Sequence, residues 1–196
     1  MQTYRLSPAG RRLTLVLLVA ALLIWAFAIW SFASTLRISY NPLQLWPSLQ
    51  RSLAEGLGVG QVVPALLMLA LIVATPLLIW NLLEEWAAAY TPTPEGLRFA
   101  SLGLSVTYPW HAITSVRRAD DDAEEPLDEL LLDGDYTGQI QSPVLRFLHR
   151  QAFGATRLPI YAGLEGRDEL LAEIRRRAEA PPPADAPSAG PAPTAA

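Results

Sequence analysis

Two long stretches without a charged residue restrict what this chain can fold into. One runs from Leu13 to Thr35 and the other from Gln61 to Leu83. A helix of that length spans roughly 34 Å at about 1.5 Å per residue, enough to cross a hydrocarbon core of about 30 Å. The sequence therefore predicts two transmembrane helices. Pro64 falls in the first turn of the second helix, and Pro76 falls mid-helix, where we expect a kink.

A cleaved signal peptide is the alternative reading of the first stretch. Arg11 and Arg12 would form its basic region, the apolar run 13–24 would follow, and residues 26–28 have the small-x-small form of a cleavage site. Against cleavage, the apolar run continues to Phe32 and includes two tryptophans. Tryptophans toward the end of a span are typical of the membrane interface.

Arginine counts predict the orientation of the two spans. Arg5, Arg11 and Arg12 precede the first span without an acidic residue among them, whereas the connecting segment 36–60 carries two arginines. Because basic residues favour the cytoplasmic side, we expect the N-terminus inside. Two spans return the chain to that side. We therefore expect a multi-pass protein of the cell inner membrane, with residues 1–12 and everything from residue 84 onward in the cytoplasm.

The segment 36–60 between the spans has apolar residues at helical spacing. They are Leu45, Trp46, Leu49, Leu53 and Leu57. This pattern predicts a short helix on the membrane surface of an external loop. A simple connector resting on lipid and a helix that docks a partner both fit the pattern.

Composition excludes several kinds of site. Most of the apolar residues lie in the segment 1–83, and most of the acidic ones lie in the segment 84–196. The chain has no cysteine, which excludes disulfides, thiolate catalysis and cysteine-based zinc sites. A net charge of -4 argues against general nucleic-acid binding.

Residues 91–118 have the pattern of a β-hairpin with one buried face. Residues 91–96 form a proline- and glycine-rich break, and apolar and polar residues then alternate over 97–100 and 104–108. Gly103 marks a tight turn between these two runs. Ile113 and Val116 continue the apolar stripe after a Pro-Trp turn.

Two short motifs in this region carry a family resemblance. The run Thr93-Pro94-Glu95-Gly96-Leu97 and the later run Tyr108-Pro109-Trp110-His111-Ala112-Ile113 resemble the T-x-x-G-L opening and the P-W-x-x-I turn of bacterial pleckstrin-homology-like (PH-like) domains. Those domains are often fused to two membrane helices. The resemblance covers about residues 86–179 and implies a curved antiparallel sheet, or partial barrel, capped by a C-terminal helix. It gives structural roles to Gly96, Leu97, Pro109, Trp110 and Ile113, and no ligand or catalytic residues.

The remaining segments complete a membrane helical hairpin joined to an α+β domain over residues 84–179. Residues 130–132 are a candidate buried strand, and residues 158–161 resemble the last strand of the PH-like fold. Residues 142–152 favour a short helix with Ser142 as N-cap and Pro143 at N1, with a strand as the alternative. Residues 163–179 predict an amphipathic helix whose acidic start and arginine-rich end suit the helix dipole. The proline- and alanine-rich segment 180–196 predicts a disordered tail.

No catalytic constellation stands out. The acidic run 120–125 lacks the glycine and distal glutamate of an EF-hand, so we interpret it as a solvated loop. His111 and His149 have no serine, cysteine or second histidine at a catalytic or ligand spacing. Glu84 and Glu85 are either a paired acid site or, as we expect, charges where the helix leaves the lipid. We expect no enzyme and no cofactor or metal.

One local basic cluster, comprising Arg146, His149, Arg150 and Arg157, could contact anionic lipid headgroups. An ordinary solvated face is its alternative interpretation. The function that we expect is a non-enzymatic, membrane-anchored interaction module that scaffolds a membrane or cytoplasmic partner protein. An anionic-lipid sensor is the alternative function, and self-association into a homo-oligomer is the alternative to a separate protein partner.

Overall fold

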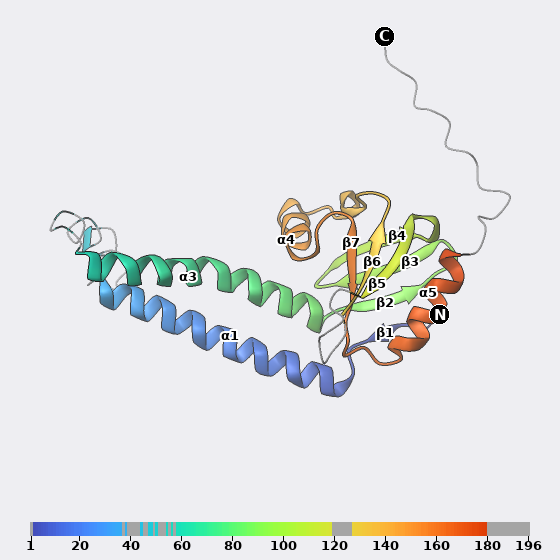
Figure 1. Cartoon of the computed structure of the whole chain (residues 1–196), viewed down its shortest axis with the longest axis horizontal. Coiled ribbons are helices and arrows are strands. Elements are labelled where there is room, and N and C mark those ends of the chain that lie inside the picture. The colour runs from blue at the N-terminus through green and yellow to red at the C-terminus, as the bar shows by residue number, and fades with distance from the viewer. Residues whose placement is uncertain are drawn as a thin grey trace, which may run out of the picture.

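The computed structural model describes residues 2–36, 58–118 and 127–179, together with isolated positions between 38 and 56. Two long helices, α1 (Pro8–Thr35) and α3 (Val59–Trp86), lie side by side and lead into a globular domain (Figure 1). Both helices are long and apolar enough to cross a membrane. They contain the two predicted spans in full, and each extends past its span toward the domain.

The two helices pack through small side chains. Thr14, Ala21 and Ala28 are buried on α1, each one heptad after the last, and Ala65 and Thr75 are buried on α3. A heptad is close to two helical turns, so the α1 positions lie on one face. Small residues let helix backbones approach each other closely within a bilayer. The larger apolar side chains of both helices point outward, as lipid-facing residues do.

Pro76 lies inside α3, as the sequence predicts, and it removes one helical hydrogen bond. The missing N–H would have bonded the carbonyl of Ile72, one turn earlier. The indole Nε1 of Trp25 on α1 donates to that carbonyl oxygen at 3.1 Å. A side chain of the neighbouring helix thus satisfies the acceptor that the proline leaves free in an apolar setting.

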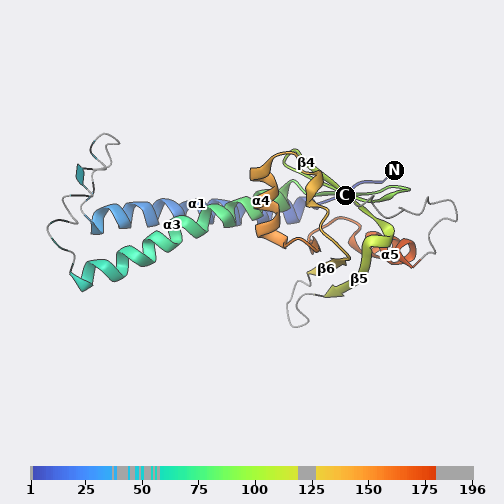
Figure 2. The same cartoon turned by 90° about the horizontal axis from the view of Figure 1, so that it is seen from above.

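The globular domain contains two antiparallel sheets. The first has the order β1-β2-β3-β4, with β1 (Tyr4–Arg5), β2 (Ala89–Pro92), β3 (Gly96–Ser101) and β4 (Leu104–Pro109). The second has the order β5-β6-β7, with β5 (Ile113–Arg118), β6 (Asp128–Leu132) and β7 (Arg157–Ile160). Helix α4 (Pro143–Phe153) lies on the side of the domain nearest the long helices, and α5 (Arg167–Ala178) lies on the far side (Figures 1 and 2).

The core lies between the sheets and α5. Alternate residues of the strands point inward, including Tyr90, Phe99 and Val106 of the first sheet and Leu130 of the second. Leu170, Leu171 and Ile174 of α5 join the same buried cluster. The helix therefore closes the core with the apolar face that the sequence predicts. The chain therefore belongs to a mixed helix-and-sheet fold class.

The N-terminal strand β1 is a feature that the sequence analysis did not foresee. Tyr4 pairs with Tyr90 and Arg5 with Ala89, so residues before the first long helix complete the first sheet. On the other side, Leu6 forms a bridge with Leu164, and the N–H of Ser7 donates to the carbonyl of Gly163 at 2.9 Å. Both ends of the helical hairpin are therefore fastened to one domain and lie on the same side.

Most predicted elements of the domain are confirmed. The hairpin is β3–β4, with Gly103 in the turn at a φ of +82°. The ambiguous segment 142–152 is helical, and the Ser142 hydroxyl accepts the N–H of Leu145 at its start. The predicted acidic loop, most of the segment 36–60 and the C-terminal tail lie outside the described residues.

We predict that Trp25→Phe destabilises the helical hairpin by about 1–2 kcal/mol, because the Ile72 carbonyl then has no donor. The same change should cost clearly less in a Pro76→Ala background, where residue 76 regains its own N–H. Circular dichroism in detergent micelles gives the free energy of unfolding of the wild-type chain, the two single variants and the double variant. These four values give the coupling energy between Trp25 and Pro76. Equal costs in the two backgrounds would contradict this role for Trp25.

Candidate functional site

The junction between α3 and the globular domain holds a buried acid–imidazole pair. Glu84, in the last turn of α3, and His149, in the middle of α4, both have an exposed fraction of 0%. Oε1 of Glu84 lies 2.5 Å from Nδ1 of His149. The indole Nε1 of Trp80, one turn earlier on α3, donates to the other carboxylate oxygen at 2.9 Å. Each oxygen of this buried carboxylate thus has a hydrogen-bond partner.

Aromatic side chains of the domain enclose this pair. The hydroxyl of Tyr108 lies 3.4 Å from Nε2 of His149. The ring centres of Phe99 and Phe153 lie 5.7 Å and 5.1 Å from the centre of the imidazole. Burial raises the pKa of Tyr108, and the charge of Glu84 acts in the same direction. Phenol and imidazole thus belong to one enclosed polar cluster.

The backbone of Glu84 is also held. The hydroxyl of Ser101, at the end of β3, donates to the carbonyl oxygen of Glu84 at 2.7 Å. One residue of α3 therefore binds both a strand and α4. Because solvent does not reach the pair, its geometry suits fastening the helix to the domain better than turnover of a substrate.

Two sequence-based assignments at this junction are wrong. Glu84 does not face the lipid boundary as an exposed charge, because its side chain is buried against α4. His149 does not belong to an exposed basic cluster, because its side chain is buried against Glu84 of α3. The two residues lie 65 positions apart. No local spacing signals such a pair, although a histidine between apolar positions of an amphipathic helix is a weak hint of burial.

The three arginines of the predicted basic cluster separate into two places. Arg146 and Arg150 lie on α4 and line a shallow groove of about 340 Å³ with Phe147. Arg157 begins β7, and its guanidinium lies 3.9 Å from Glu129 of β6. Arg157 is therefore not part of the groove on α4.

The two α4 arginines also have partners within the chain. Arg146 donates to the carbonyl oxygen of Ile140 at 2.7 Å. Arg150 lies 3.4 Å from the carboxylate of Asp135. A hydrogen bond from the Thr137 hydroxyl lowers the pKa of Asp135, and the charge of Arg150 acts in the same direction. These contacts position the two guanidinium groups and leave Arg150 half exposed.

Helix α4 also has two large apolar side chains that point away from the domain. Val144 is 63% exposed and Phe147 is 62% exposed. They lie one turn apart, on the face opposite His149. Exposed apolar residues grouped in this way commonly mark a contact surface. The sequence analysis gave these two residues no functional role.

The motif residues of the family resemblance have structural roles. A Cβ at Gly96 would lie 2.1 Å from the carbonyl oxygen of Tyr108, so only glycine fits between these strands. Leu97 and Ile113 are buried in the core. After Pro109, the Trp110 indole donates to the carbonyl oxygen of Thr93 at 3.0 Å.

Helix α5 completes the contact between the two motifs. The guanidinium of Arg177 donates to the same Thr93 carbonyl oxygen at 2.7 Å. It also lies 5.2 Å from the ring centre of Trp110, at cation–π distance. The opening motif, the turn motif and the last helix are thus joined at one point.

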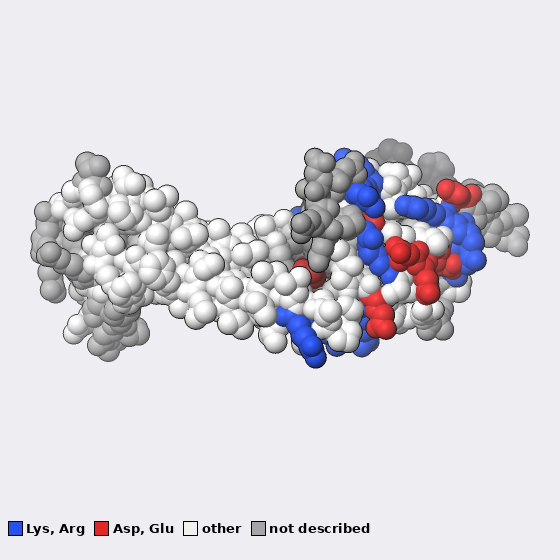
Figure 3. Space-filling model, turned by 60° about the horizontal axis from the view of Figure 1, so that its bottom comes forward, with Lys and Arg blue, Asp and Glu red and all other residues white. Residues whose placement is uncertain are grey.

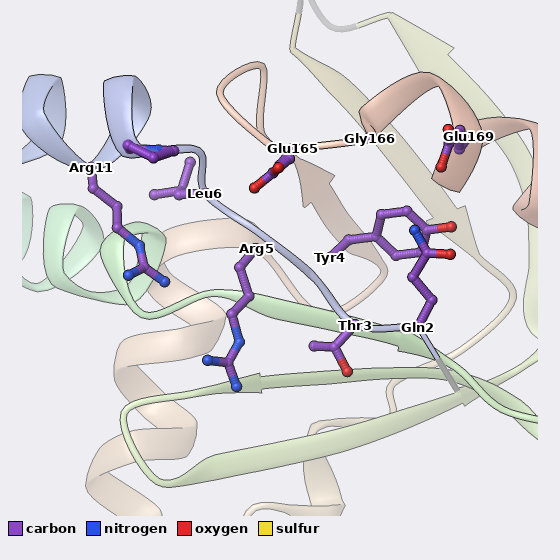
Figure 4. Close-up of a pocket in the computed structure, with 10 residues that line it drawn as sticks. Gln2, Thr3, Tyr4, Arg5, Leu6, Arg11, Glu165, Gly166 and Glu169 are labelled. Carbon is purple, nitrogen blue, oxygen red and sulfur yellow. The ribbon is translucent and has the colours of Figure 1, made fainter.

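A groove with a volume of about 780 Å³ lies between β1 and the start of α5 (Figure 4). Its lining mixes both charges, with Arg5 and Arg11 from the N-terminal segment and Glu165 and Glu169 from the α5 side. Among the described residues, no group of three histidine or acidic side chains could hold a metal ion.

Comparison with protein-family models, with curated proteins and with solved structures finds no match for this chain. The function therefore has to be inferred from the geometry.

We predict that Glu84→Ala destabilises the chain by about 3–5 kcal/mol, because it leaves the buried His149 and the Trp80 N–H without a partner. The matched control is Glu95→Ala, since Glu95 is an exposed carboxylate in the β2–β3 turn. Urea unfolding of the full chain in detergent gives both values. The double variant Glu84→Leu/His149→Leu should retain more of the stability than Glu84→Ala, because it removes both members of the buried pair. A cost for Glu84→Ala no larger than for Glu95→Ala would contradict the assignment.

Proposed function

We propose that this chain is a non-enzymatic interaction module, anchored in the cell inner membrane, that holds a partner protein at the membrane surface. Two helices of transmembrane length support the anchor. The enclosed Glu84–His149 pair supports a non-enzymatic role, because both of its side chains are closed to solvent. The observation that carries the proposal is the uncovered edge of β5.

A PH-like fold for the domain is part of this proposal. Two antiparallel sheets followed by a C-terminal helix fit that architecture. The contacts among Thr93, Trp110 and Arg177 connect both family motifs to α5. With this fold, the N-terminal strand extends the first sheet by one member.

A cytoplasmic location of both termini is also proposed. The pairing of β1 with β2 keeps the start of α1 and the end of α3 on the same side. Arg5, Arg11 and Arg12 are concentrated on that side, and cytoplasmic segments are enriched in such residues. Signal-peptide cleavage would remove β1 from the sheet, which argues for an uncleaved first helix.

Three of the four sheet edges are covered within the described part of the chain. At β4, the side-chain amide of Gln139 bonds both the N–H and the carbonyl of Thr107, at 3.0 and 2.8 Å. At β1, the backbone of residues 163–165 lies alongside. At β7, Pro159 offers no N–H, and its carbonyl accepts the Tyr90 hydroxyl at 2.6 Å.

The outer side of β5 has no comparable cover among the described residues. Thr114, Ser115, Arg117 and Arg118 are exposed there. An uncovered edge accepts an extended segment of another protein through backbone hydrogen bonds. Arg118 would favour an acidic segment, and Arg117 is already paired with Glu129 of β6 at 3.0 Å. A groove of about 350 Å³ beside α5, lined in part by Glu173 and Arg177, provides further contact area.

We predict that a photoreactive residue at Ser115 on β5 cross-links to one partner protein in native membranes. The matched control places the same residue at Gln151, an exposed position on α4. Mass spectrometry should identify one discrete adduct for Ser115 and none for Gln151. The same adducts from both positions, or none from Ser115, would overturn the β5 assignment. An adduct with a second copy of this chain would replace the separate partner with self-association.

A second candidate function, contact with anionic lipid, is supported by α4. This helix lies beside the end of α3 in both views (Figures 1 and 2), and its His149 binds Glu84 in the last turn of α3. Its exposed Val144 and Phe147 and its arginines would then lie at the level where α3 leaves the bilayer. Apolar side chains flanked by arginines suit the membrane interface.

We predict that a fluorophore on Val144→Cys is quenched by brominated lipid in nanodiscs, whereas the same label on Ser115→Cys is not. The absence of natural cysteines makes each label unique. In anionic nanodiscs, the change of Arg146, Arg150 and Arg157 to Glu should reduce the quenching and leave the Ser115 cross-link in place. Equal quenching at both positions would exclude a specific lipid contact by α4.

A further inference from the structure

A second basic surface lies where the two long helices join the domain. It is a groove of about 490 Å³, bordered by Arg5 and Arg11 on one side and by Arg98 on the other. Trp86, the last residue of α3, and Leu102, in the β3–β4 turn, also line it. We call it the neck groove. None of its residues belongs to β5, to α4 or to the Glu84–His149 pair.

Strand register builds the floor of the neck groove. Arg5, Ala89, Ala100 and Ser105 stand directly opposite one another across the four strands of the first sheet. Side chains in one such row project from the same face of a sheet. The two alanines in the middle leave that face hollow between longer side chains. Arg98, two positions before Ala100 on β3, projects from the same face.

The arginines of the groove remain available for a ligand. Arg5, Arg11 and Arg98 are exposed, and none of them forms an ion pair with a carboxylate among the described residues. Arg98 uses only its Nε, which donates to the Ser105 hydroxyl at 3.0 Å. Figure 4 shows Arg5 and Arg11 extending to the same side of the N-terminal segment, away from the Tyr4 ring and Glu169.

The groove lies at the level of the membrane surface. Arg11 is in the first turn of α1, directly before the uncharged run that starts at Leu13. Trp86 ends α3, and the hydroxyl of Ser101 ties the β3–β4 turn to the Glu84 carbonyl. In Figure 3, basic side chains appear where the uncharged surface of the helices meets the domain. A phosphate of the adjacent leaflet would therefore lie within reach of these arginines.

Two exposed apolar side chains flank the arginines. Trp86 is 45% exposed and Leu102 is 36% exposed. Leu102 adopts a φ of +46°, a left-handed conformation that is unfavourable for a residue with a Cβ. The chain thus places an unfavourable exposed leucine at a strained turn position. Contact with acyl chains would give that side chain an apolar environment.

We propose that the neck groove binds the phosphate headgroup of an anionic phospholipid from the leaflet next to the domain. Arg5, Arg11 and Arg98 contact the phosphate oxygens, and Trp86 and Leu102 contact the start of the acyl chains. Guanidinium groups are suited to this role because they bind phosphate through paired, charge-assisted N–H donors. Basic pockets beside transmembrane helices on the cytoplasmic side are known to hold such headgroups. The proposal requires that the two helices span a membrane, but it is independent of the partner surface on β5 and of lipid contact by α4.

The test is native mass spectrometry of the full chain in detergent, titrated with dioleoyl phosphatidylglycerol or with dioleoyl phosphatidylcholine. The wild-type chain should bind one phosphatidylglycerol several-fold more tightly than phosphatidylcholine. Arg98→Gln should weaken phosphatidylglycerol binding about fivefold, and Arg5→Gln/Arg98→Gln about 30-fold, as expected for about 1 kcal/mol per arginine at a membrane surface. Phosphatidylcholine binding should change little.

The matched control is Arg118→Gln/Arg175→Gln, which removes two positive charges from exposed positions on β5 and α5. It should retain the preference for phosphatidylglycerol, and all variants should keep the wild-type unfolding midpoint. An equal loss in the control, or a preference retained by Arg5→Gln/Arg98→Gln, would overturn the proposal. Displacement of the lipid by inorganic phosphate would overturn the lipid assignment and indicate a site for free phosphate. A normal Ser115 cross-link in the Arg5→Gln/Arg98→Gln chain separates this result from the partner proposal.

Discussion

A carboxylate that is removed from water must be compensated, and the position of the whole globular domain depends on how this chain compensates Glu84. The side chain bonds His149 of α4 and Trp80 of its own helix, and its backbone carbonyl accepts the Ser101 hydroxyl. The end of a long apolar helix is thereby attached to two separate parts of the domain. Movement of the domain relative to α3 would break these hydrogen bonds and either expose the buried groups or leave them without partners. The junction therefore has a defined geometry.

The arrangement of functional surfaces follows from that junction. The strand β5 lies on a different sheet from the neck groove, and α4 lies beside the end of α3 (Figures 1 and 2). In the proposed function, the surfaces that contact lipid, on α4 and at the neck groove, are therefore separate from the open sheet edge of β5. The two proposed contacts, with lipid and with a protein segment, are compatible with each other because they use different residues.

The sequence predicts the local elements well and the long-range contacts poorly. Periodicity and capping residues such as Ser142 identify the hairpin, α4 and α5, because these signals act over a few positions. Strand β1 was missed, since so short a strand has no periodicity and both long helices separate it from its partner β2 along the chain. The Glu84–His149 pair was missed because its two members are equally remote in sequence. The neck groove depends on register across four strands, which local sequence does not specify.

The N-terminal strand also sets an order for how this protein is made. Tyr4 and Arg5 leave the ribosome before their partners on β2, which follow only after both apolar helices have been synthesised. The first sheet therefore cannot be completed until the helical hairpin brings its two ends together on one side of the membrane. In the proposed membrane topology, a chain whose second helix failed to insert would leave β1 and the rest of the domain on opposite sides of the bilayer. Completion of the sheet would then depend on correct insertion of both helices.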